Sequence, residues 1–362
     1  MKRIKSLCVV TDKYPAKDDP SYAFVGELVK AFSRRGVKCT VICGFAKKRD
    51  NVRTDYDADG NEIKVFQAFI PSLGLKRIGP KALTYYYRDR KFRQLFKESK
   101  CRPDAIYAHF WHAGIAAAGI AEKEGLPLFV AAGESRIFVR EVYSAGIVDK
   151  YKKFVRGVIS VSTENRDDSV SQGLTSGDAA IVVPNAIDET LFRKLDKNEC
   201  RKRLSVAPTD FVVAFTGAFI DRKGPLRVAE AVAMVPGVKS FYIGKGEQKP
   251  QGDGIVFCGQ LPHNEIPVYL NAADVFVLPT KREGCCNAIV EAMACGLPII
   301  STDRRFNDDI LNGKNSIRVD CENIEQIAQA IKTIKGSPRL RQAMSEESLR
   351  IASTLTIDKR AA

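Results

Sequence analysis

Two glutamates, Glu283 and Glu291, stand on either side of the predicted start of a short helix. The pattern predicts a strand that ends near Thr280 and a helix over about 288–295, with Asn287 as its N-cap. The first amides of such a helix lack intrahelical partners, so they form a site for an anion such as a diphosphate. The two carboxylates would repel that anion unless they accept hydrogen bonds from hydroxyl groups, which favours sugar rings beside it. Glutamates near a helix start can also be there because the helix dipole stabilises them.

Ten cysteines are spread along the chain, and no two of them form a Cys-x-x-Cys pair. Most lie inside apolar runs that are typical of buried strands or helices. Reduced thiols are therefore favoured over disulfides or a zinc site. The sequence predicts no metal site.

Positive charge is concentrated in the first 100 residues, which hold 23 Lys and Arg against 11 Asp and Glu, in a chain of formal net charge +14. The segment 75–100 combines nine basic and two acidic residues with five aromatic ones. A helix with basic and aromatic faces fits docking on an anionic membrane surface, with candidate contacts at Arg88, Arg90, Lys91 and Arg93. A plain solvated helix is the alternative. Nucleic acid is disfavoured because no DNA- or RNA-binding motif accompanies the charge.

Short apolar runs separated by helix-like segments recur along the chain and predict βαβ units with parallel sheets. The rhythm restarts after a charged stretch at 188–204, which is the natural linker. We expect one Rossmann-like domain over 1–187, a second over 205–345, and a C-terminal helix over 346–362 that packs back toward the first domain. Two such domains facing one another would leave a cleft between the carboxyl ends of their strands.

The 362 residues are 45% apolar and 28% charged, which excludes a disordered chain and a membrane-embedded bundle. No apolar stretch approaches the roughly 20 residues that a membrane-spanning helix needs, and the first residues show no secretory signal. We therefore expect a cytoplasmic protein, peripheral on the inner face of the cytoplasmic membrane if the basic helix docks there.

The segment TKREGCCNAIVEAMACGLPII (280–300), with AADVFVLPT before it, resembles the signature of the retaining glycosyltransferases of family 4. Further motifs similar to that family are TGAFIDRKG (216–224), FYIGKGEQ (241–248) and VPNAIDETLF (183–192), and the resemblance covers nearly the whole chain. It implies the GT-B fold, in which two Rossmann-like domains face each other across a cleft. It also implies transfer of a sugar from a nucleotide-sugar donor without a metal or other cofactor, and UDP-sugars are favoured because they are the commoner donors of the family.

The resemblance implies roles for single residues. Lys223 would bind the donor phosphates and Glu283 the donor sugar, and both would support catalysis. Arg222 would replace an arginine that the family carries where this chain has Ala218. Glu291 would accept hydrogen bonds from the ribose. The other implied donor contacts are Gly217, Gly244, Gly284, Cys285, Cys286, Asn287, Ala288 and Ile289.

On the acceptor side, the family often has a His-Gly pair where this chain reads Ala132-Gly133, followed by Glu134. His109 or His112 would have to supply the imidazole, although each can also be structural. The acceptor-side candidates are therefore His109, His112, Gly133 and Glu134. In the front-face mechanism favoured for such enzymes, the leaving phosphate takes the acceptor proton, so no separate general base is needed.

The predicted function is that of a retaining glycosyltransferase acting on a lipid-linked glycan during the assembly of a surface polysaccharide. One alternative is a GT-B sugar-nucleotide epimerase or phosphorylase. Another is a degenerate subunit that binds nucleotide sugar without turnover, which Ala132 and Ala218 make credible and the intact Lys223, Glu283 and Glu291 oppose. A Rossmann dehydrogenase is disfavoured because no Gly-x-Gly-x-x-Gly follows the first strand.

Overall fold

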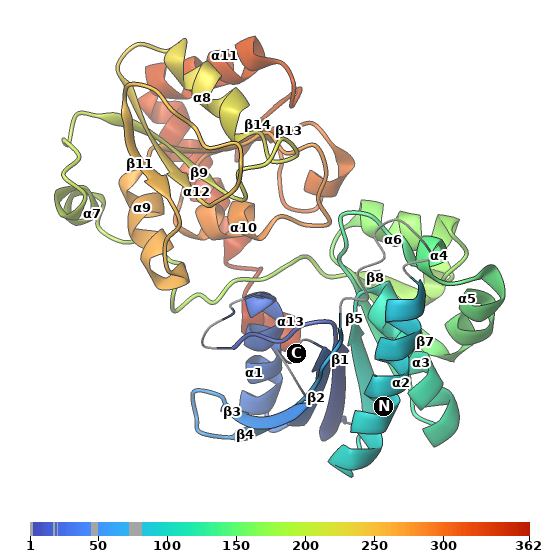
Figure 1. Ribbon diagram of the computed structural model, residues 1–362. Helices are drawn as coiled ribbons and strands as arrows, with labels where there is room; N and C mark the ends of the chain where they lie inside the picture. Colours follow the sequence, from blue (N-terminus) through green and yellow to red (C-terminus); the bar gives the residue numbers. More distant parts are fainter. Residues whose placement is uncertain (1–2, 17–18, 20, 45–49, 72–81) are drawn as a thin grey trace. The chain divides into compact units, whose positions relative to one another are not determined.

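The chain folds into two compact units in the computed structural model, which describes residues 3–16, 19, 21–44, 50–71 and 82–362. Unit 1 comprises Met1–Val183 and Arg360–Ala362, and unit 2 comprises Pro184–Lys359. Each unit is an α/β domain on one sheet, as predicted (Figure 1).

Unit 1 has a sheet whose strands, in the described part of the chain, are β1 (Ser6–Thr11), β2 (Lys38–Gly44), β3 (Asn51–Tyr56), β4 (Glu62–Ala68), β5 (Ala105–His109), β6 (Leu128–Ala132), β7 (Val155–Ser160) and β8 (Ala180–Val182). Their order is β3-β4-β2-β1-β5-β6-β7-β8, and only β3 runs antiparallel to its neighbour. The order reverses between β1 and β5. Such a switch point opens a crevice at the carboxyl ends of these two strands.

The helices described in unit 1 are α1 (Ala23–Arg34), α2 (Ala82–Ser99), α3 (Trp111–Glu124), α4 (Val139–Val142), α5 (Ala145–Tyr151) and α6 (Thr163–Ser171). Small residues let α3 pack directly on the sheet and against α2. A Cβ on Gly114 would lie 2.7 Å from Cγ2 of Val130, so this glycine allows α3 to approach β6 closely. The position of α3 fixes the residues that follow β5.

Unit 2 has a parallel sheet made of β9 (Phe211–Thr216), β10 (Val238–Ile243), β11 (Ile255–Gly259), β12 (Val275–Leu278), β13 (Ile299–Thr302) and β14 (Ser316–Val319). The order is β11-β10-β9-β12-β13-β14, with the reversal between β9 and β12. The helices of unit 2 are α7 (Lys197–Arg203), α8 (Pro225–Ala233), α9 (Ile266–Ala272), α10 (Asn287–Ala294), α11 (Ile324–Gly336) and α12 (Pro338–Ala352).

The segment 188–204 is not the free linker that its charge suggested. It contains α7, whose Arg201 is buried and donates to the carbonyl of Ala272 at 2.9 Å and to Asp274 at 2.7 Å. These bonds hold the segment on unit 2, so the boundary between the units falls at 183/184 instead.

The predicted helix over 346–362 is two helices. The longer one, α12, stays in unit 2 against α10. The short α13 (Ile357–Ala361) follows it, and only Arg360–Ala362 belong to unit 1. No helix in the described ranges has the length and apolar character needed to cross a membrane.

Candidate functional site

The loops after β9 and β10 touch each other backbone to backbone at the carboxyl end of the unit 2 sheet, next to the switch point between β9 and β12. The amide of Gly217 donates to the carbonyl of Ile243 at 2.9 Å. A Cβ on Gly244 would lie 1.9 Å from the carbonyl oxygen of Gly217, and one on Gly246 would lie 2.3 Å from that of Phe219. Only glycine allows so close an approach, which fixes the turn that carries Arg222 and Lys223.

Glu283 brings the two predicted cations together. Its Oε1 atom lies 2.6 Å from Nζ of Lys223 and 2.7 Å from Nη1 of Arg222. The hydroxyl of Thr280 donates to the same oxygen at 2.7 Å. The side chains of Lys223 and Glu283 are only 13% and 12% exposed, so this ion cluster is largely shielded from water. The contacts of Glu283 in the described residues all use Oε1, which leaves Oε2 available to a ligand.

Lys223 also faces Cys286, whose Sγ lies 3.9 Å from Nζ. Burial alone would lower the pKa of Lys223, but Cys286 and Glu283 more than offset this and raise it above its ordinary value. Lys223 is therefore a permanent cation at neutral pH. Burial raises the pKa of the Cys286 thiol, which opposes formation of a thiolate beside Glu283.

Helix α10 starts one residue earlier than predicted. Cys286 occupies the N-cap position and makes no side-chain capping bond, whereas Asn287 is the first helical residue. We expected the amide of Ile289 to lack a helical partner. It instead donates to the carbonyl of Cys286 at 3.1 Å. The Oδ1 atom of Asn287 is buried without a hydrogen-bond partner in the described structure. A hydroxyl group of a bound ligand could donate a hydrogen bond to this unpaired acceptor.

Hydrogen bonds from Asn185 and to Arg222 fix the loop between β12 and α10. The carbonyl of Cys285 accepts a hydrogen bond from Nδ2 of Asn185 at 2.9 Å. The amide of Lys281 donates to the carbonyl of Arg222 at 2.8 Å, which ties this loop to the turn after β9. Gly284 lies in this loop, so the implied donor contacts from Gly217 to Ile289 gather at one sheet edge.

Glu291 lies one turn into α10, and its Oε1 atom is 3.2 Å from Nε2 of His263. The His263 ring packs against Phe192, with ring centroids 5.0 Å apart. Sequence reasoning did not connect His263 with this site. His263 lies in a short turn before α9, and its position in the sequence does not indicate a contact with Glu291. That contact depends on how α9 packs.

In unit 1, the structure places His112 at the switch point between β1 and β5. Its Nε2 atom bonds Asp12, which follows β1 directly. The guanidinium of Arg88 donates to the other Asp12 oxygen at 2.5 Å and to the hydroxyl of Tyr143 at 2.8 Å. Burial alone would raise the pKa of Asp12, but Arg88 and His112 hold it well below its usual range. The imidazole of His112 is thus fixed by a charged partner, which sequence reasoning missed.

His109 is buried, and burial lowers its pKa to about 3, with further lowering by Arg360 and His112. It is therefore neutral near pH 7. Glu134 accepts hydrogen bonds from the amides of Trp111 at 2.5 Å and Gly133 at 2.9 Å, and burial raises its pKa. Glu134 thus satisfies backbone donors at the start of α3. The four acceptor-side candidates do share one edge of the sheet.

One predicted membrane contact is wrong. Arg88 is only 4% exposed, because its ion pairs with Asp12 and Asp89 replace the hydration of the guanidinium. Arg90 and Arg93 are exposed, and Lys91 is partly covered through its 2.8 Å pair with Asp50. The part of the basic segment before residue 82 lies outside the described residues.

Two aromatic residues have an unusual backbone, and one of them, Phe110, packs against His112. Tyr22 and Phe110 have φ angles of 64° and 73°, which non-glycine residues rarely adopt. Their rings contact each other edge to face with centroids 5.7 Å apart. Such strain persists only where surrounding contacts impose it, and it concentrates at functional sites.

Within the described ranges, no group of three His, Cys, Asp or Glu side chains is placed to hold a metal ion. The residues of the candidate donor site on unit 2 are cations, carboxylates and backbone amides.

Two family models match the chain. The one described as Glycosyltransferase Family 4 matches residues 23–191, and the one described as Glycosyl transferases group 1 matches residues 210–335. TuaC of Bacillus subtilis (strain 168), a glycosyltransferase assigned to teichuronic acid biosynthesis, is 26% identical over 348 residues, or 89% of this chain and 87% of TuaC. The lipopolysaccharide core biosynthesis glycosyltransferase LpsE of Rhizobium meliloti (strain 1021) is 31% identical over 157 residues, or 40% of this chain and 46% of LpsE.

Solved structures show the same fold. Sucrose-phosphate synthase from Thermosynechococcus elongatus has a TM-score of 0.76 at 17% identity, with 98% of this chain and 97% of that chain covered. Anabaena Alr3699/HepE in complex with UDP and glucose has a TM-score of 0.72 at 18% identity, with the same coverage. The two family models together span most of both units, and the protein belongs to the family 4 glycosyltransferases of the GT-B fold.

Proposed function

We propose that the protein moves a sugar from a UDP-sugar to a hydroxyl of a lipid-linked glycan, with retention of configuration, during surface polysaccharide biosynthesis. The observation that carries the proposal is the ion cluster in which Glu283 holds Lys223 and Arg222 close to the start of α10. The names of TuaC and LpsE support the polysaccharide setting. The UDP and glucose bound by HepE support the donor class.

The donor diphosphate would lie against Lys223, Arg222 and the first turn of α10. The ammonium group supplies a point charge and the guanidinium a planar fork of donors, and both stabilise the negative charge that develops on the leaving diphosphate. The anion would draw these cations away from Oε1 of Glu283. That carboxylate could then accept hydrogen bonds from hydroxyls of the donor sugar, with Oε2 already available.

Glu291 would accept the ribose hydroxyls of the nucleotide. Its Oε1 atom is engaged by His263 in the described structure, and this contact orients the carboxylate along α10. Its side chain is 13% exposed, so a hydrogen bond made there is shielded from competing water.

Retention would follow from attack on the face that the leaving group departs from. The bond from the anomeric carbon to the phosphate oxygen breaks, the bond to the acceptor oxygen forms, and the acceptor proton passes to that phosphate oxygen. No protein base is required. This agrees with a neutral, buried His109 and with a Glu134 that is occupied by backbone amides.

The test is a calorimetric titration with UDP, GDP and ADP, first with a chelator and then with magnesium. We expect metal-independent binding of UDP that Glu291→Ala weakens by about 1–3 kcal/mol through lost hydrogen bonds. Glu325→Ala, an exposed glutamate of α11, is the matched control and should bind as the wild type does. Failure of every nucleotide to bind would overturn the proposal, because the ion cluster and the start of α10 would then not form a donor site.

The epimerase or phosphorylase alternative is tested separately with UDP-glucose and inorganic phosphate, in the absence of any glycan acceptor. Proton NMR would follow the anomeric signals for an epimer or for glucose 1-phosphate formed with inorganic phosphate. Either product, formed without any glycan acceptor, would replace the transferase proposal.

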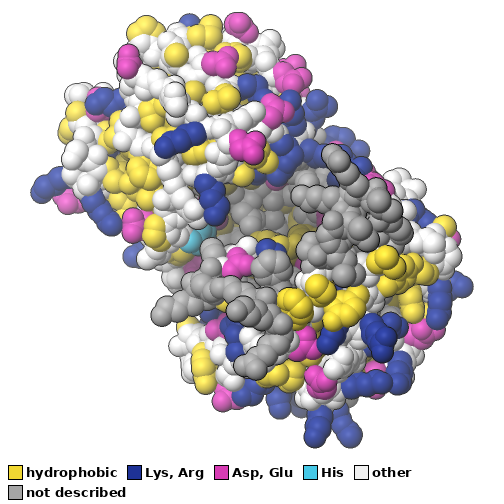
Figure 2. All heavy atoms as spheres, viewed as in Figure 1, with side chains coloured by type: hydrophobic (Ala, Val, Ile, Leu, Met, Phe, Trp, Pro, Cys, Tyr) yellow, Lys and Arg dark blue, Asp and Glu magenta, His cyan; other side chains and the backbone are white. Residues whose placement is uncertain are grey.

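We also propose that the protein is cytoplasmic and meets an anionic membrane surface through the exposed cations of α2. On the face that Figure 2 presents, Lys and Arg side chains gather along the lower edge of unit 1. Charge reversal in Arg90→Glu should reduce sedimentation with phosphatidylglycerol vesicles. The matched control is Arg339→Glu in α12. If both variants sediment with vesicles to the same extent as the wild type, the proposal that α2 meets the membrane is overturned.

A further inference from the structure

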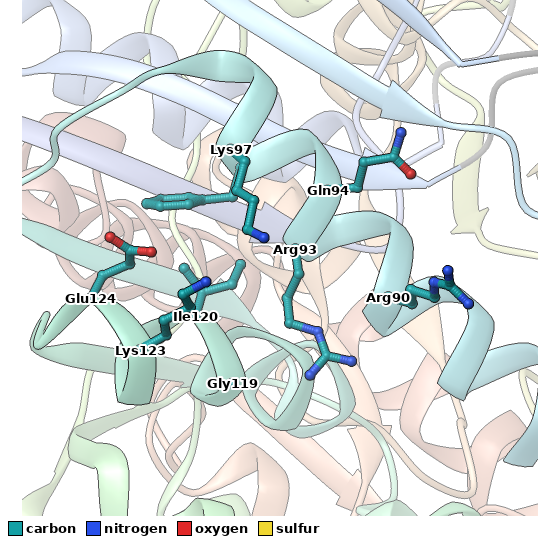
Figure 3. Close-up of a pocket in the computed structure, with 9 residues that line it drawn as sticks. Arg90, Arg93, Gln94, Lys97, Gly119, Ile120, Lys123 and Glu124 are labelled. Carbon is teal, nitrogen blue, oxygen red and sulfur yellow. The ribbon is translucent and has the colours of Figure 1, made fainter.

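A pocket of about 530 Å³ opens between α2 and α3 in unit 1 (Figure 3). Arg90, Arg93 and Lys97 line it from α2, and Lys123 lines it from α3. Figure 3 shows Lys97 and Lys123 projecting toward the same opening from the two facing helices. The lining also includes Gln94, the apolar Phe96 and Ile120, and a single carboxylate, Glu124.

The positive charge of this pocket is not neutralised by the described structure. No carboxylate of the described residues lies within 4.0 Å of any of the four cations. Neighbouring cations do have such partners, since Lys91 pairs with Asp50 at 2.8 Å and Lys150 with Glu122 at 3.1 Å. The four cations therefore lack a close ion pair, although Asp89 still interacts with Arg93 electrostatically and Glu124 lines the pocket.

Three of the cations repel one another along one helix face. Arg90, Arg93 and Lys97 are three and four residues apart, a spacing at which like charges destabilise a helix. The helix dipole favours cations in a last turn, which accounts for Lys97 in α2 and Lys123 in α3. It does not account for Arg90, which lies mid-helix. A bound anion would offset the repulsion of the whole set.

The pocket lies far from the acceptor-side candidates within unit 1. Lys97 and Lys123 are in the turns that precede β5 and β6, so they sit where these parallel strands begin. Asp12 and His112 sit where β1 and β5 end. A ligand in the pocket would thus occupy the opposite edge of the sheet. Arg93 also lines an adjoining cavity of about 300 Å³ together with Lys150 and Asp89.

We propose that this pocket binds the phosphoryl group of an anionic ligand. Guanidinium groups give paired N–H donors that match phosphate oxygens, and the two ammonium groups add point charges across the opening. The phosphoryl group belongs either to a phospholipid headgroup or to a soluble phosphorylated compound. The inference is independent of the transferase reaction, because each of its residues lies in unit 1 and the donor cluster lies in unit 2.

The test uses pyrophosphate and vesicles as probes. Pyrophosphate is titrated calorimetrically at constant ionic strength, and vesicles of phosphatidylcholine with or without phosphatidylglycerol are sedimented with the protein. All measurements are made in a Lys223→Ala background, so that the contribution of the donor site is reduced and is the same in every variant. The variant is Arg93→Gln with Lys97→Gln. The matched control is Arg339→Gln with Lys332→Gln, which removes the same charges from exposed positions of unit 2.

We expect the pocket variant to weaken binding of at least one probe by about tenfold or more, with the control unchanged. Loss of pyrophosphate binding assigns a soluble ligand, and loss of vesicle binding alone assigns a lipid headgroup. Equal weakening in the control, or no weakening in the pocket variant, would overturn the inference. Should the double variant not fold, the exposed Arg90→Gln replaces it under the same criteria.

Discussion

Glu283 is the residue on which both donor-site cations depend. It pairs with both Lys223 and Arg222, and its own charge is shielded by the same contacts. Removing that charge leaves a largely buried ammonium group without its carboxylate, which costs more than an exposed pair would.

Glu283→Gln should therefore lower the free energy of unfolding of unit 2 by about 1–3 kcal/mol and reduce the affinity for UDP-glucose relative to that for UDP, because the sugar hydroxyls lose a charged acceptor. Urea unfolding followed by circular dichroism measures the first effect, and calorimetry measures the second. Glu325→Gln in α11 serves as the control. An unfolding midpoint equal to that of the wild type would show that the ion cluster adds nothing to stability.

His109 makes the stability of unit 1 depend on pH. Its pKa is about 3 when folded and about 6.5 when unfolded, so between these values the unfolded chain binds a proton that the folded one does not. Stability due to His109 is complete above about pH 6.5 and is lost as the pH falls, by up to about 1.4 kcal/mol per unit.

The measurement is urea unfolding of unit 1 between about pH 5 and 6.5, above the ordinary pKa values of carboxyl groups, with the His109 contribution taken as the difference between wild type and variant. Trp111 is the only tryptophan of the chain, is buried in unit 1, and so reports this unit by fluorescence. His109→Asn should flatten the pH dependence. His263→Asn, in unit 2, should leave it unchanged, and equal slopes in wild type and His109→Asn would contradict the assignment.

Single residues could be predicted from sequence where they are close along the chain. Arg222 and Lys223 are adjacent, and Glu283 and Glu291 flank one helix start. Arg88 was placed on the surface instead, because its partner Asp12 is 76 residues away and only the packing of α2 against the sheet brings them together. Pairing across such distances has no local pattern.

At the scale of elements, the donor site depends on two strand-end loops that touch through their glycines. Gly244→Ala should push the turns after β9 and β10 apart, because the new Cβ would lie 1.9 Å from a carbonyl oxygen. We expect loss of UDP binding and a drop of about 2 kcal/mol or more in the stability of unit 2. Gly313→Ala, where a Cβ meets nothing within 4 Å, should be neutral in calorimetry and thermal unfolding alike. Wild-type UDP affinity in Gly244→Ala would show that the loops adapt.

Buried parallel strands could be predicted because they are apolar runs, whereas β3 was missed. Its sequence NVRTDY is polar and mostly exposed, as an edge strand can be. The turn that joins it to β4 contains Asp59-Gly60, with Gly60 at a φ of 83°, and this hairpin signal could have revealed it. Likewise α7 was read as a linker, since its charges gave no hint of the buried bond between Arg201 and Asp274.

At the scale of the whole molecule, the two units should respond differently to a donor. A ligand whose free concentration is 100 times its dissociation constant stabilises the folded site by about 2.7 kcal/mol. UDP should therefore raise the unfolding temperature of unit 2 more than that of unit 1. Circular dichroism follows the unfolding of unit 2, and Trp111 fluorescence follows that of unit 1. Coincident transitions that shift equally would show that both units unfold as one.

The chain passes between the units twice, after Val183 and again before Arg360. The two passages are hydrogen-bonded to each other. Arg360 donates to the carbonyl of Val183, the amide of Ile187 donates to the carbonyl of Leu355, and the amide of Ile357 donates to the carbonyl of Ile187. A protease cut at 183/184 would therefore leave Arg360–Ala362 of the second fragment bound in unit 1 by contacts such as the one between Arg360 and Val183. A cut before Arg360 would leave the two units joined by the peptide chain at 183/184.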